Sequence, residues 1–162
     1  MRLALYQPDI PQNVGTLMRL AAALGIPLDI IEPCGFAISD KGLRRAAMDY
    51  ADLAAVSRHI SWQTFLETVP APSRLVLLTT KAETPYTEFA FGAADILLLG
   101  RESAGVPDEV HDRADARLLI PMRSPARSVN VALAGSMVLG EALRQTVGFP
   151  APAGHVATAS AL

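Results

Sequence analysis

Residues 118–148 read LLIPMRSPARSVNVALAGSMVLGEALRQTVG. The segment starts with an apolar run that is typical of a buried strand, and its second half, about Val129–Val147, is predicted to be a helix that is apolar nearly all round. The loop between them holds Arg123, Arg127, Ser128 and Asn130. Two guanidinium groups, a hydroxyl and an amide between two core elements mark this loop as a candidate for chemistry.

That strand belongs to a set of five apolar runs, which together predict a sheet. They are RLALY (2–6), LDIIE (28–32), RLVLLTT (74–80), DILLLG (95–100) and ARLLIPM (116–122). The last three are apolar on both faces, which a parallel sheet with two covered faces requires. We therefore predict an α/β fold with a mostly parallel sheet that helices cover on both faces. The default topology is an open doubly wound sheet, because threaded chains are nearly absent from proteins.

Helices are expected between these strands. The first is predicted to have Asn13 as its N-cap, to end at Gly25, and to bury Val14, Leu17, Met18, Ala21 and Leu24. Ser39 or Asp40 is expected to begin a second helix, and Ser61 is expected to cap WQTFLETV (62–69). AAVSRH (54–59) is predicted to form a short edge strand.

Length and composition predict one globular domain. The chain has 162 residues, of which 51% are hydrophobic and 19% are charged. We assign residues 1–150 to this domain and expect the Pro/Ala-rich tail, 151–162, to be poorly ordered. The apolar stretch Val131–Gly140 is too short to cross a membrane, and no signal peptide is recognisable. These features predict a cytoplasmic protein that does not associate with membranes.

Cysteine, histidine and charge content narrow the chemistry. A single cysteine, Cys34, excludes an internal disulfide, and the scattered His59, His111 and His155 do not suggest a metal site. The net charge of −2 argues against general nucleic-acid binding. Twelve of the fourteen basic residues are arginines, however, and guanidinium groups suit bidentate recognition of phosphate.

The loops after the three apolar runs are where a ligand is expected, because ligands of such sheets bind outside the carboxyl ends of the strands. These loops read TTKAETP, GRESAGVP and PMRSPARSVN. They contain no dinucleotide-binding GxGxxG, no P-loop GK[ST] and no GxSxG nucleophile elbow. Dehydrogenase, NTPase and hydrolase functions are therefore disfavoured.

Three segments together resemble a known family. NVGTLMR (13–19), LLLGRESAGVP (97–107) and IPMRSPARSVNVA (120–132) are similar, in order and spacing, to the motifs of SpoU-type RNA ribose methyltransferases of the SPOUT superfamily. The short chain, together with IPQNVGTLMRLAAALG (10–25), IIEPCGF (30–36) and LRRAAMDY (43–50), most resembles its tRNA wobble-position members. In SVNVALAG (128–135) the chain departs from relatives that commonly place Ser or Asn shortly after the motif asparagine.

The resemblance implies a fold and an activity. It implies a deep trefoil knot in the C-terminal half, a homodimer formed through the C-terminal helix, and S-adenosylmethionine as the cofactor, converted to S-adenosylhomocysteine, without a metal. The substrate would be the tRNA anticodon region, with methylation of the ribose 2′-oxygen of a cytidine or modified uridine at position 34. Ribosomal RNA methylation, or an RNA- or nucleotide-binding module without catalysis, remain alternatives.

The resemblance also implies roles for individual residues. It places Leu78, Gly100, Ile120 and Ser128 around the cofactor, and it gives catalytic roles to Arg19, Asn13, Glu102, Ser128 and Asn130. Arg123 and Arg127 are candidates for RNA contacts. Arg19 would either abstract the proton of the ribose hydroxyl or stabilise the developing alkoxide; we favour stabilisation, because a guanidinium group stays protonated at any ordinary pH.

Overall fold

A single parallel sheet forms the centre of the molecule in the computed structural model, which describes residues 1–38 and 55–151. Its seven strands lie in the order β3-β2-β1-β6-β4-β7-β5, and every neighbouring pair is parallel. The strands are β1 (Arg2–Tyr6), β2 (Leu28–Ile31), β3 (Val56–His59), β4 (Leu75–Leu78), β5 (Thr84–Pro85), β6 (Ile96–Leu99) and β7 (Ala116–Leu119). The predicted α/β class and parallel sheet are confirmed.

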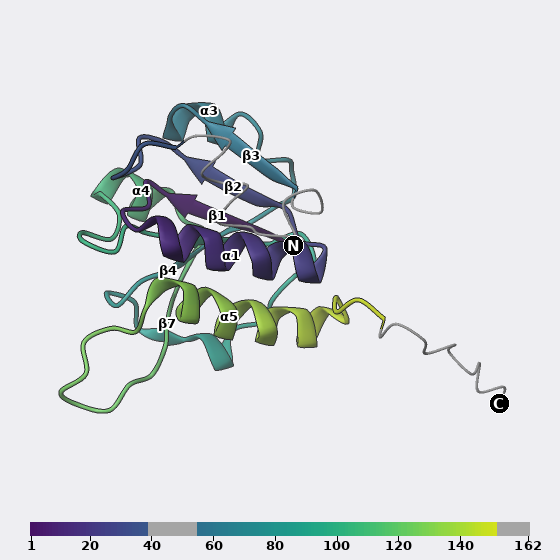
Figure 1. The fold of residues 1–162 in the computed structure, drawn as a ribbon. Coiled ribbons are helices and arrows are strands. Elements are labelled where there is room, and N and C mark those ends of the chain that lie inside the picture. The colour runs from purple at the N-terminus through teal and green to yellow at the C-terminus, as the bar shows by residue number, and fades with distance from the viewer. Residues whose placement is uncertain (39–54, 152–162) are drawn as a thin grey trace, which may run out of the picture.

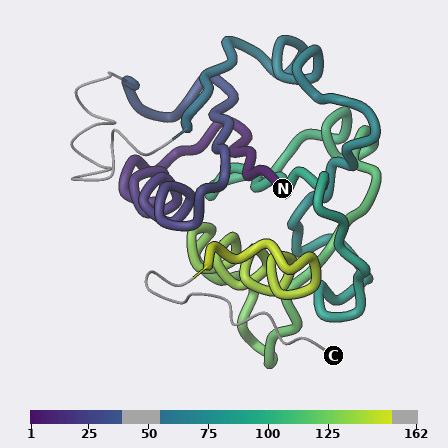
Figure 2. The backbone as a smooth tube through the Cα atoms, turned by 90° about the vertical axis from the view of Figure 1, so that its right-hand side faces the viewer, coloured from purple at the N-terminus to yellow at the C-terminus, as the bar shows by residue number. Residues whose placement is uncertain are grey.

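Helices cover both faces of the sheet, as predicted. They are α1 (Pro11–Leu24), α3 (Trp62–Leu66), α4 (Asp108–Arg113) and α5 (Val131–Thr146), with a 3₁₀ turn, η2 (Tyr86–Glu88). Figure 1 and Figure 2 both show α1 and α5 side by side. The alternation of side chains along β1 divides the core: Leu3 and Leu5 pack with α1 and α5, whereas Ala4 and Tyr6 pack with α3 and α4.

Helix α1 begins three residues earlier than predicted. Its N-cap is Ile10, which makes no side-chain cap, and Pro11 occupies the first turn. The prediction that Asn13 caps this helix is wrong: proline presets the backbone of the first turn, so the helix starts before Asn13. Asn13 is instead buried within α1, and its amide is used elsewhere. The end is as predicted, because Gly25 adopts a left-handed conformation with φ of 66°.

Helix α5 starts at the end of the polar loop that the sequence singled out. Asn130 is its N-cap, and the side-chain oxygen accepts the backbone N–H groups of Ala132 and Leu133. One face of α5 is buried, with Gly135 so close to the sheet that a Cβ there would lie 2.9 Å from Leu99. The opposite face leaves Leu133 and Met137 exposed, at 60% and 44%.

The remaining elements follow the sequence in part. Ser61 caps α3 through a capping box with Thr64, as expected, but the helix ends at Leu66 rather than near Val69. β3 is the predicted edge strand, whereas α4, β5 and η2 were not predicted. The helix expected from Ser39 or Asp40 lies outside the described residues, as does nearly all of the C-terminal tail. No helix in the described part of the chain is both long and apolar enough to span a membrane.

Val147 ends α5 in a conformation that disfavours it. Its φ is 52°, in the left-handed region, and its side chain is 91% exposed, so little packing compensates. We expect Val147→Gly to raise the free energy of unfolding by about 1 kcal/mol, because glycine removes the clash of Cβ with the backbone. Urea denaturation of the two proteins measures this difference, with Val147→Ala as the control that keeps Cβ. Equal midpoints for Val147→Gly and the parent would contradict the prediction.

Candidate active site

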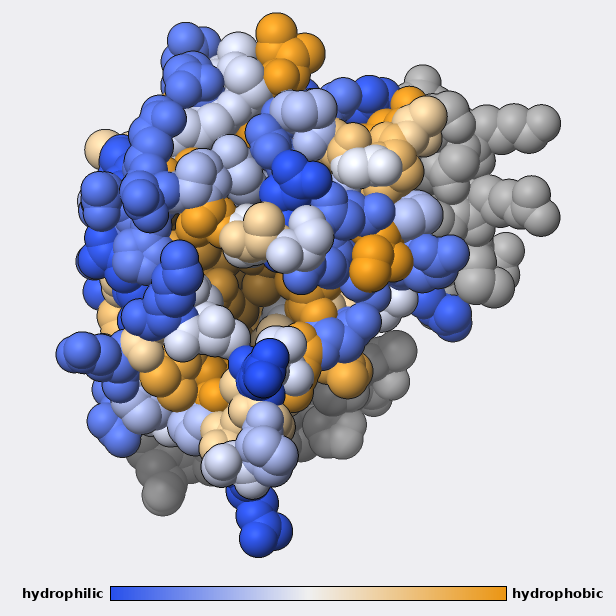
Figure 3. Space-filling model, turned by 90° about the vertical axis from the view of Figure 1, so that its left-hand side faces the viewer, coloured by the Kyte–Doolittle hydropathy of each residue, from blue (hydrophilic) through white to orange (hydrophobic). Residues whose placement is uncertain are grey.

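A cleft opens at the carboxyl ends of β4, β6 and β7. Its volume is about 970 Å³, and its walls are the three loops that the sequence singled out together with the first turns of α1 and α5. Figure 3 views this end of the molecule and shows a hollow whose depth is apolar and whose surroundings are largely polar. A cleft of this size at the carboxyl edge of a parallel sheet is the usual form and place of a ligand site.

Most of the residues predicted for the site line this cleft. Those that do so are Leu78, Gly100 and Ile120 at the ends of three strands, and Asn13, Glu102, Arg127, Ser128 and Asn130 around them. Arg19 and Arg123 do not line it. Arg19 is an exposed residue of α1, about 9 Å further along the helix axis than Asn13. Within one chain, the structure therefore brings together the residues predicted to bind the cofactor and the predicted polar residues, but not Arg19.

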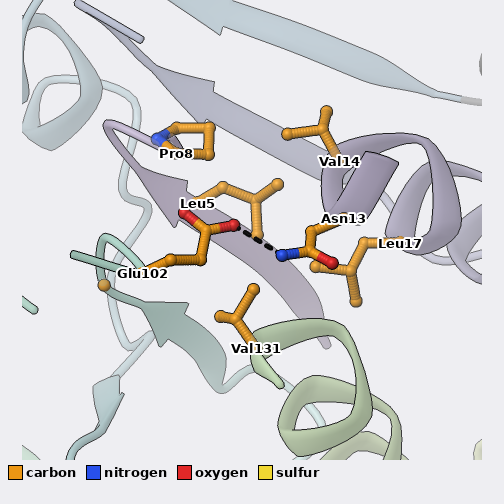
Figure 4. Close-up of a pocket in the computed structure, with 8 residues that line it drawn as sticks. Leu5, Pro8, Asn13, Val14, Leu17, Glu102 and Val131 are labelled. Atoms are coloured by element: carbon orange, nitrogen blue, oxygen red, sulfur yellow. Dashed lines mark hydrogen bonds between the residues drawn. The ribbon is translucent and has the colours of Figure 1, made fainter. Parts of the chain in front are cut away.

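Three side chains that line the cleft are linked to one another by hydrogen bonds. The Asn13 amide donates to Glu102 Oε1 at 2.8 Å, as Figure 4 shows, and Asn130 Nδ2 donates to Asn13 Oδ1 at 2.9 Å. Asn130 Oδ1 in turn accepts the first amides of α5. This series of hydrogen bonds links the loop after β6, helix α1 and the start of α5, which are far apart in the sequence.

The carboxylate of Glu102 determines how both amides are oriented. An ionised carboxylate can only accept hydrogen bonds, so the NH₂ group of Asn13 must face Glu102. Asn13 Oδ1 then faces Asn130, which must offer its own NH₂ group and turn its oxygen toward α5. The α5 amides can only donate, so both ends of the chain require the same orientation.

Two N–H groups remain available in this arrangement. Each amide carries two N–H donors, and one of each is used within the chain of hydrogen bonds. The second N–H of Asn13 and of Asn130 has no partner among the described residues. Donors fixed in this way at the edge of a cleft can stabilise negative charge that develops on an oxygen atom.

The loop that carries Glu102 is closed on itself. Arg101 and Gly105 exchange two backbone hydrogen bonds of 2.9 Å, and Gly105 has a left-handed φ of 69°. At Gly100, a Cβ would lie 2.8 Å from the backbone of Gly105. Glycine is therefore required at both positions to let the loop fold back across the end of β6.

The sequence did not identify several residues of this region. Asp9, in the turn after β1, forms an ion pair with Arg101, with 2.6 Å between Oδ1 and Nη2, and accepts a hydrogen bond from Ser103. The Arg101 guanidinium, followed by Ser103, lowers the pKa of Asp9 to about 2. The position of Asp9 could have indicated its place near the site, because Asp9 follows a parallel strand at the same edge as the predicted loops.

Ile10 and Val129 are a second group that the sequence did not identify. Both line the cleft beside the chain of hydrogen bonds, and each is 40% exposed. Thr79, Thr80 and Lys81, from the predicted loop TTKAETP, line it as well. No group of three or more potential metal ligands occurs within residues 1–38 and 55–151.

Known proteins with the same segments identify the family. The profile of the SpoU rRNA Methylase family matches residues 1–140. A tRNA (cytidine(34)-2′-O)-methyltransferase from Beijerinckia indica is 62% identical over 88% of this chain and 90% of its own length.

Solved structures agree with that match. One, described as giving structural insights into the 2-OH methylation of C/U34 on tRNA, has a TM-score of 0.85 and 44% identity, over 91% of this chain and 96% of that one. The SpoU methyltransferase AviRb from Streptomyces viridochromogenes, in complex with the cofactor AdoMet, has a TM-score of 0.81 and 26% identity, over 90% and 60% of the two chains. The chain described here belongs to the SpoU methylase family.

Proposed function

We propose that this protein transfers a methyl group from S-adenosylmethionine to the ribose 2′-oxygen of nucleotide 34, the wobble position, of tRNA. The observation that carries the proposal is the cleft, in which the three family segments meet and place Asn13, Glu102 and Asn130 beside Leu78, Gly100 and Ile120. Neither the three hydrogen-bonded polar side chains nor the residues at the strand ends would alone make a site for two substrates.

Relatives support the choice of RNA. A protein that is 62% identical over nearly its whole length is named a tRNA (cytidine(34)-2′-O)-methyltransferase. This chain spans only 60% of the more distant AviRb, so that protein has a part which this chain does not match. The match in length and sequence to the named tRNA methyltransferase therefore favours tRNA as the substrate. With tRNA as its substrate, the protein would act in the cytoplasm.

The cleft has the properties that this cofactor needs. The cleft is lined by Leu78, Gly100 and Ile120 at the ends of β4, β6 and β7, where backbone groups could hold an adenine. Its volume of about 970 Å³ is at the upper end of the range for ligand pockets, which leaves room for a nucleotide beside the cofactor. When bound, S-adenosylmethionine supplies an electrophilic methyl group on a sulfonium centre.

The residues of the chain then bind and orient the acceptor. The second N–H groups of Asn13 and Asn130 would hold the ribose 2′-oxygen and stabilise the charge that develops when its proton leaves. Ser128, before the first turn of α5, offers a hydroxyl to either substrate. Methyl transfer needs an acceptor oxygen aligned with the reacting bond, so much of the rate enhancement would come from this positioning.

We also propose the knot and the dimer that the family resemblance implies. The trefoil knot would involve the C-terminal half, where the loops after β6 and β7 both line the cleft. The dimer would form through the exposed face of α5, which carries Leu133 and Met137. Because α1 lies beside α5, such a dimer could bring Arg19 of one subunit to the cleft of the other.

Substitution of Leu133 tests the dimer. We expect the parent protein to sediment as a dimer at micromolar concentration and Leu133→Asp to sediment as a monomer, because an unpaired carboxylate would be buried in the interface. Glu83→Asp, at an exposed position away from α5, is the control and should remain dimeric. A monomeric parent with full activity would contradict the dimer.

Methyl incorporation tests the function itself. Purified protein, tritiated S-adenosylmethionine and tRNA from cells that lack the enzyme should give label in the tRNA, and ribosomal RNA in a parallel reaction should remain unlabelled. Label in ribosomal RNA alone would show that the substrate is ribosomal RNA rather than tRNA. Cofactor binding without methyl transfer to either RNA would indicate that the protein is a binding module without catalysis.

A further inference from the structure

Asp9 contacts three consecutive residues of the loop that carries Glu102. Its Oδ1 accepts hydrogen bonds from Arg101 Nη2 at 2.6 Å and Nε at 3.2 Å, and its Oδ2 accepts from Ser103 Oγ at 2.5 Å and from the Ser103 backbone N–H at 3.1 Å. The backbone N–H of Asp9 donates to Glu102 Oε2 at 2.7 Å. One residue thus holds the neighbours of Glu102 on both sides and also its carboxylate.

The loop cannot position the Glu102 side chain by itself. Its own closure is between Arg101 and Gly105, and it involves only backbone atoms. Both partners of the Glu102 carboxylate, the Asp9 N–H and the Asn13 amide, come from a segment about ninety residues earlier in the chain. The orientation of Glu102 therefore depends on how the turn after β1 meets the loop after β6.

The turn that carries Asp9 is well fixed. Pro8 is buried, and its carbonyl accepts the Gly35 N–H at 2.9 Å. A Cβ at position 35 would lie 2.8 Å from Asp9 Oδ1, so the loop after β2 packs directly against the carboxylate. Asp9 therefore connects the turn after β1 and the loop after β2 to the loop after β6.

Ionisation keeps these contacts in place over the useful pH range. The pKa of Asp9 is lowered to about 2, first by Arg101 and then by Ser103. A lowered carboxylate pKa stabilises the folded form above the ordinary value near 4, and that contribution is lost as the pH falls from about 4 through about 2. At neutral pH the carboxylate binds both neighbours of Glu102.

We propose that Asp9 is a positioning residue for methyl transfer: by holding Arg101, Glu102 and Ser103, it orients the Glu102 carboxylate and hence the amides of Asn13 and Asn130. This inference rests on the proposed function for its kinetic test only. Asp9 itself does not line the cleft, so it acts through Glu102 rather than on the substrates.

The kinetic test is a double-mutant cycle with Glu102. We expect Asp9→Ala to lower the single-turnover rate about 10- to 100-fold, and Asp9→Asn to have a smaller effect because it keeps part of the hydrogen bonding. In a Glu102→Ala background, Asp9→Ala should change the rate less than about twofold, because its route of action is already lost. A purely structural role would instead give additive effects in the two backgrounds.

Glu32→Ala is the matched control. The Glu32 carboxylate pairs with Arg58 at 2.9 Å and is 27% exposed, which resembles the Asp9 carboxylate at 2.6 Å and 18%. Glu32 does not line the cleft, so its loss should leave the rate within about twofold of the parent. A parent-like rate for Asp9→Ala, or additive losses in the cycle, would overturn the proposal.

A second measurement does not depend on activity. The side-chain amide resonances of Asn13 and Asn130, observed by ¹H–¹⁵N NMR, should move in Asp9→Ala toward their positions in Glu102→Ala, and they should not move in Glu32→Ala. Unchanged resonances in Asp9→Ala would overturn the positioning role. A parent protein that fails to methylate RNA would refute the proposed function, while the resonances would still decide the role of Asp9.

Discussion

Glu102→Gln is expected to lower single-turnover methylation of tRNA about 100-fold, although the substitution preserves the shape of the side chain. Glutamine has one acceptor oxygen where glutamate has two, so it cannot serve both the Asp9 N–H and the Asn13 amide. Either a half-buried donor loses its partner or Asn13 rotates, and rotation turns its N–H groups away from the acceptor. Loss of one fixed donor in an active site typically costs about 3 to 4 kcal/mol of transition-state stabilisation.

The Glu102 effect must be separated from simple loss of charge or stability. Glu83→Gln removes the same charge from an exposed loop position outside the cleft and should leave the rate unchanged. Urea denaturation of Glu102→Gln should show a loss of about 1 to 3 kcal/mol, the cost of a buried donor without a partner. A rate within about threefold of the parent would show that the orientation of the two amides does not govern the reaction.

Arg19→Ala is expected to lower methyl transfer about 100- to 1,000-fold without weakening cofactor binding. The residues proposed to bind the cofactor come from the ends of β4, β6 and β7, whereas Arg19 lies on α1 and does not line the cleft of its own chain. Arg19→Lys should also lose most activity, because an ammonium group cannot reproduce the planar fork with which Arg19 would bridge phosphate and hydroxyl. Single-turnover rates and calorimetric cofactor affinities on the same preparations measure both effects.

The outcomes for Arg19 distinguish its ligands. Arg113→Ala, which removes an exposed guanidinium elsewhere, should retain the parent rate. A parallel loss of cofactor affinity in Arg19→Ala would show that its ligand is the cofactor rather than the RNA. A parent-like rate would refute a catalytic role.

Mixed dimers test whether Arg19 acts across the subunit interface. Neither Arg19→Ala nor Asn130→Ala should be active alone. If Arg19 of one subunit serves the cleft of its partner, dimers formed from one subunit of each kind contain one site with both Arg19 and Asn130, and activity should return. If Arg19 serves its own cleft, each site in the mixed dimer lacks one of the two residues and the mixture should remain inactive.

The sheet could be predicted because its physical signature is local. Runs such as ILLL in β6 are apolar at every position, and only burial on two faces explains that pattern. Short elements were missed where a local signal was weak: β5 has two residues, and α4 has six with several charges. Asparagine is a common helix cap, which led to the wrong prediction for Asn13; Pro11 starts the helix earlier, and the partners of the Asn13 amide lie far along the sequence.

In the site, too, residues with a local sequence signal could be predicted, whereas contacts between distant segments could not. Leu78, Gly100 and Ile120 could be placed from the resemblance and from the rule that ligands bind at strand ends, and they do line the cleft. The link between Asp9 and the loop after β6 could not be predicted, because neither an aspartate after a strand nor an arginine after a glycine indicates its partner. Pairings of this kind arise only when the strand order brings β1 next to β6.

The most direct test of the central claim, that the acceptor is the ribose 2′-oxygen of nucleotide 34, uses two forms of one tRNA. One form carries cytidine at position 34 and the other carries 2′-deoxycytidine there, so the two differ by a single oxygen atom. Incubation with the protein and tritiated S-adenosylmethionine should label the first in proportion to the tRNA added and leave the second at background. Equal labelling of both forms would contradict the account, because the methyl group would then be on another atom.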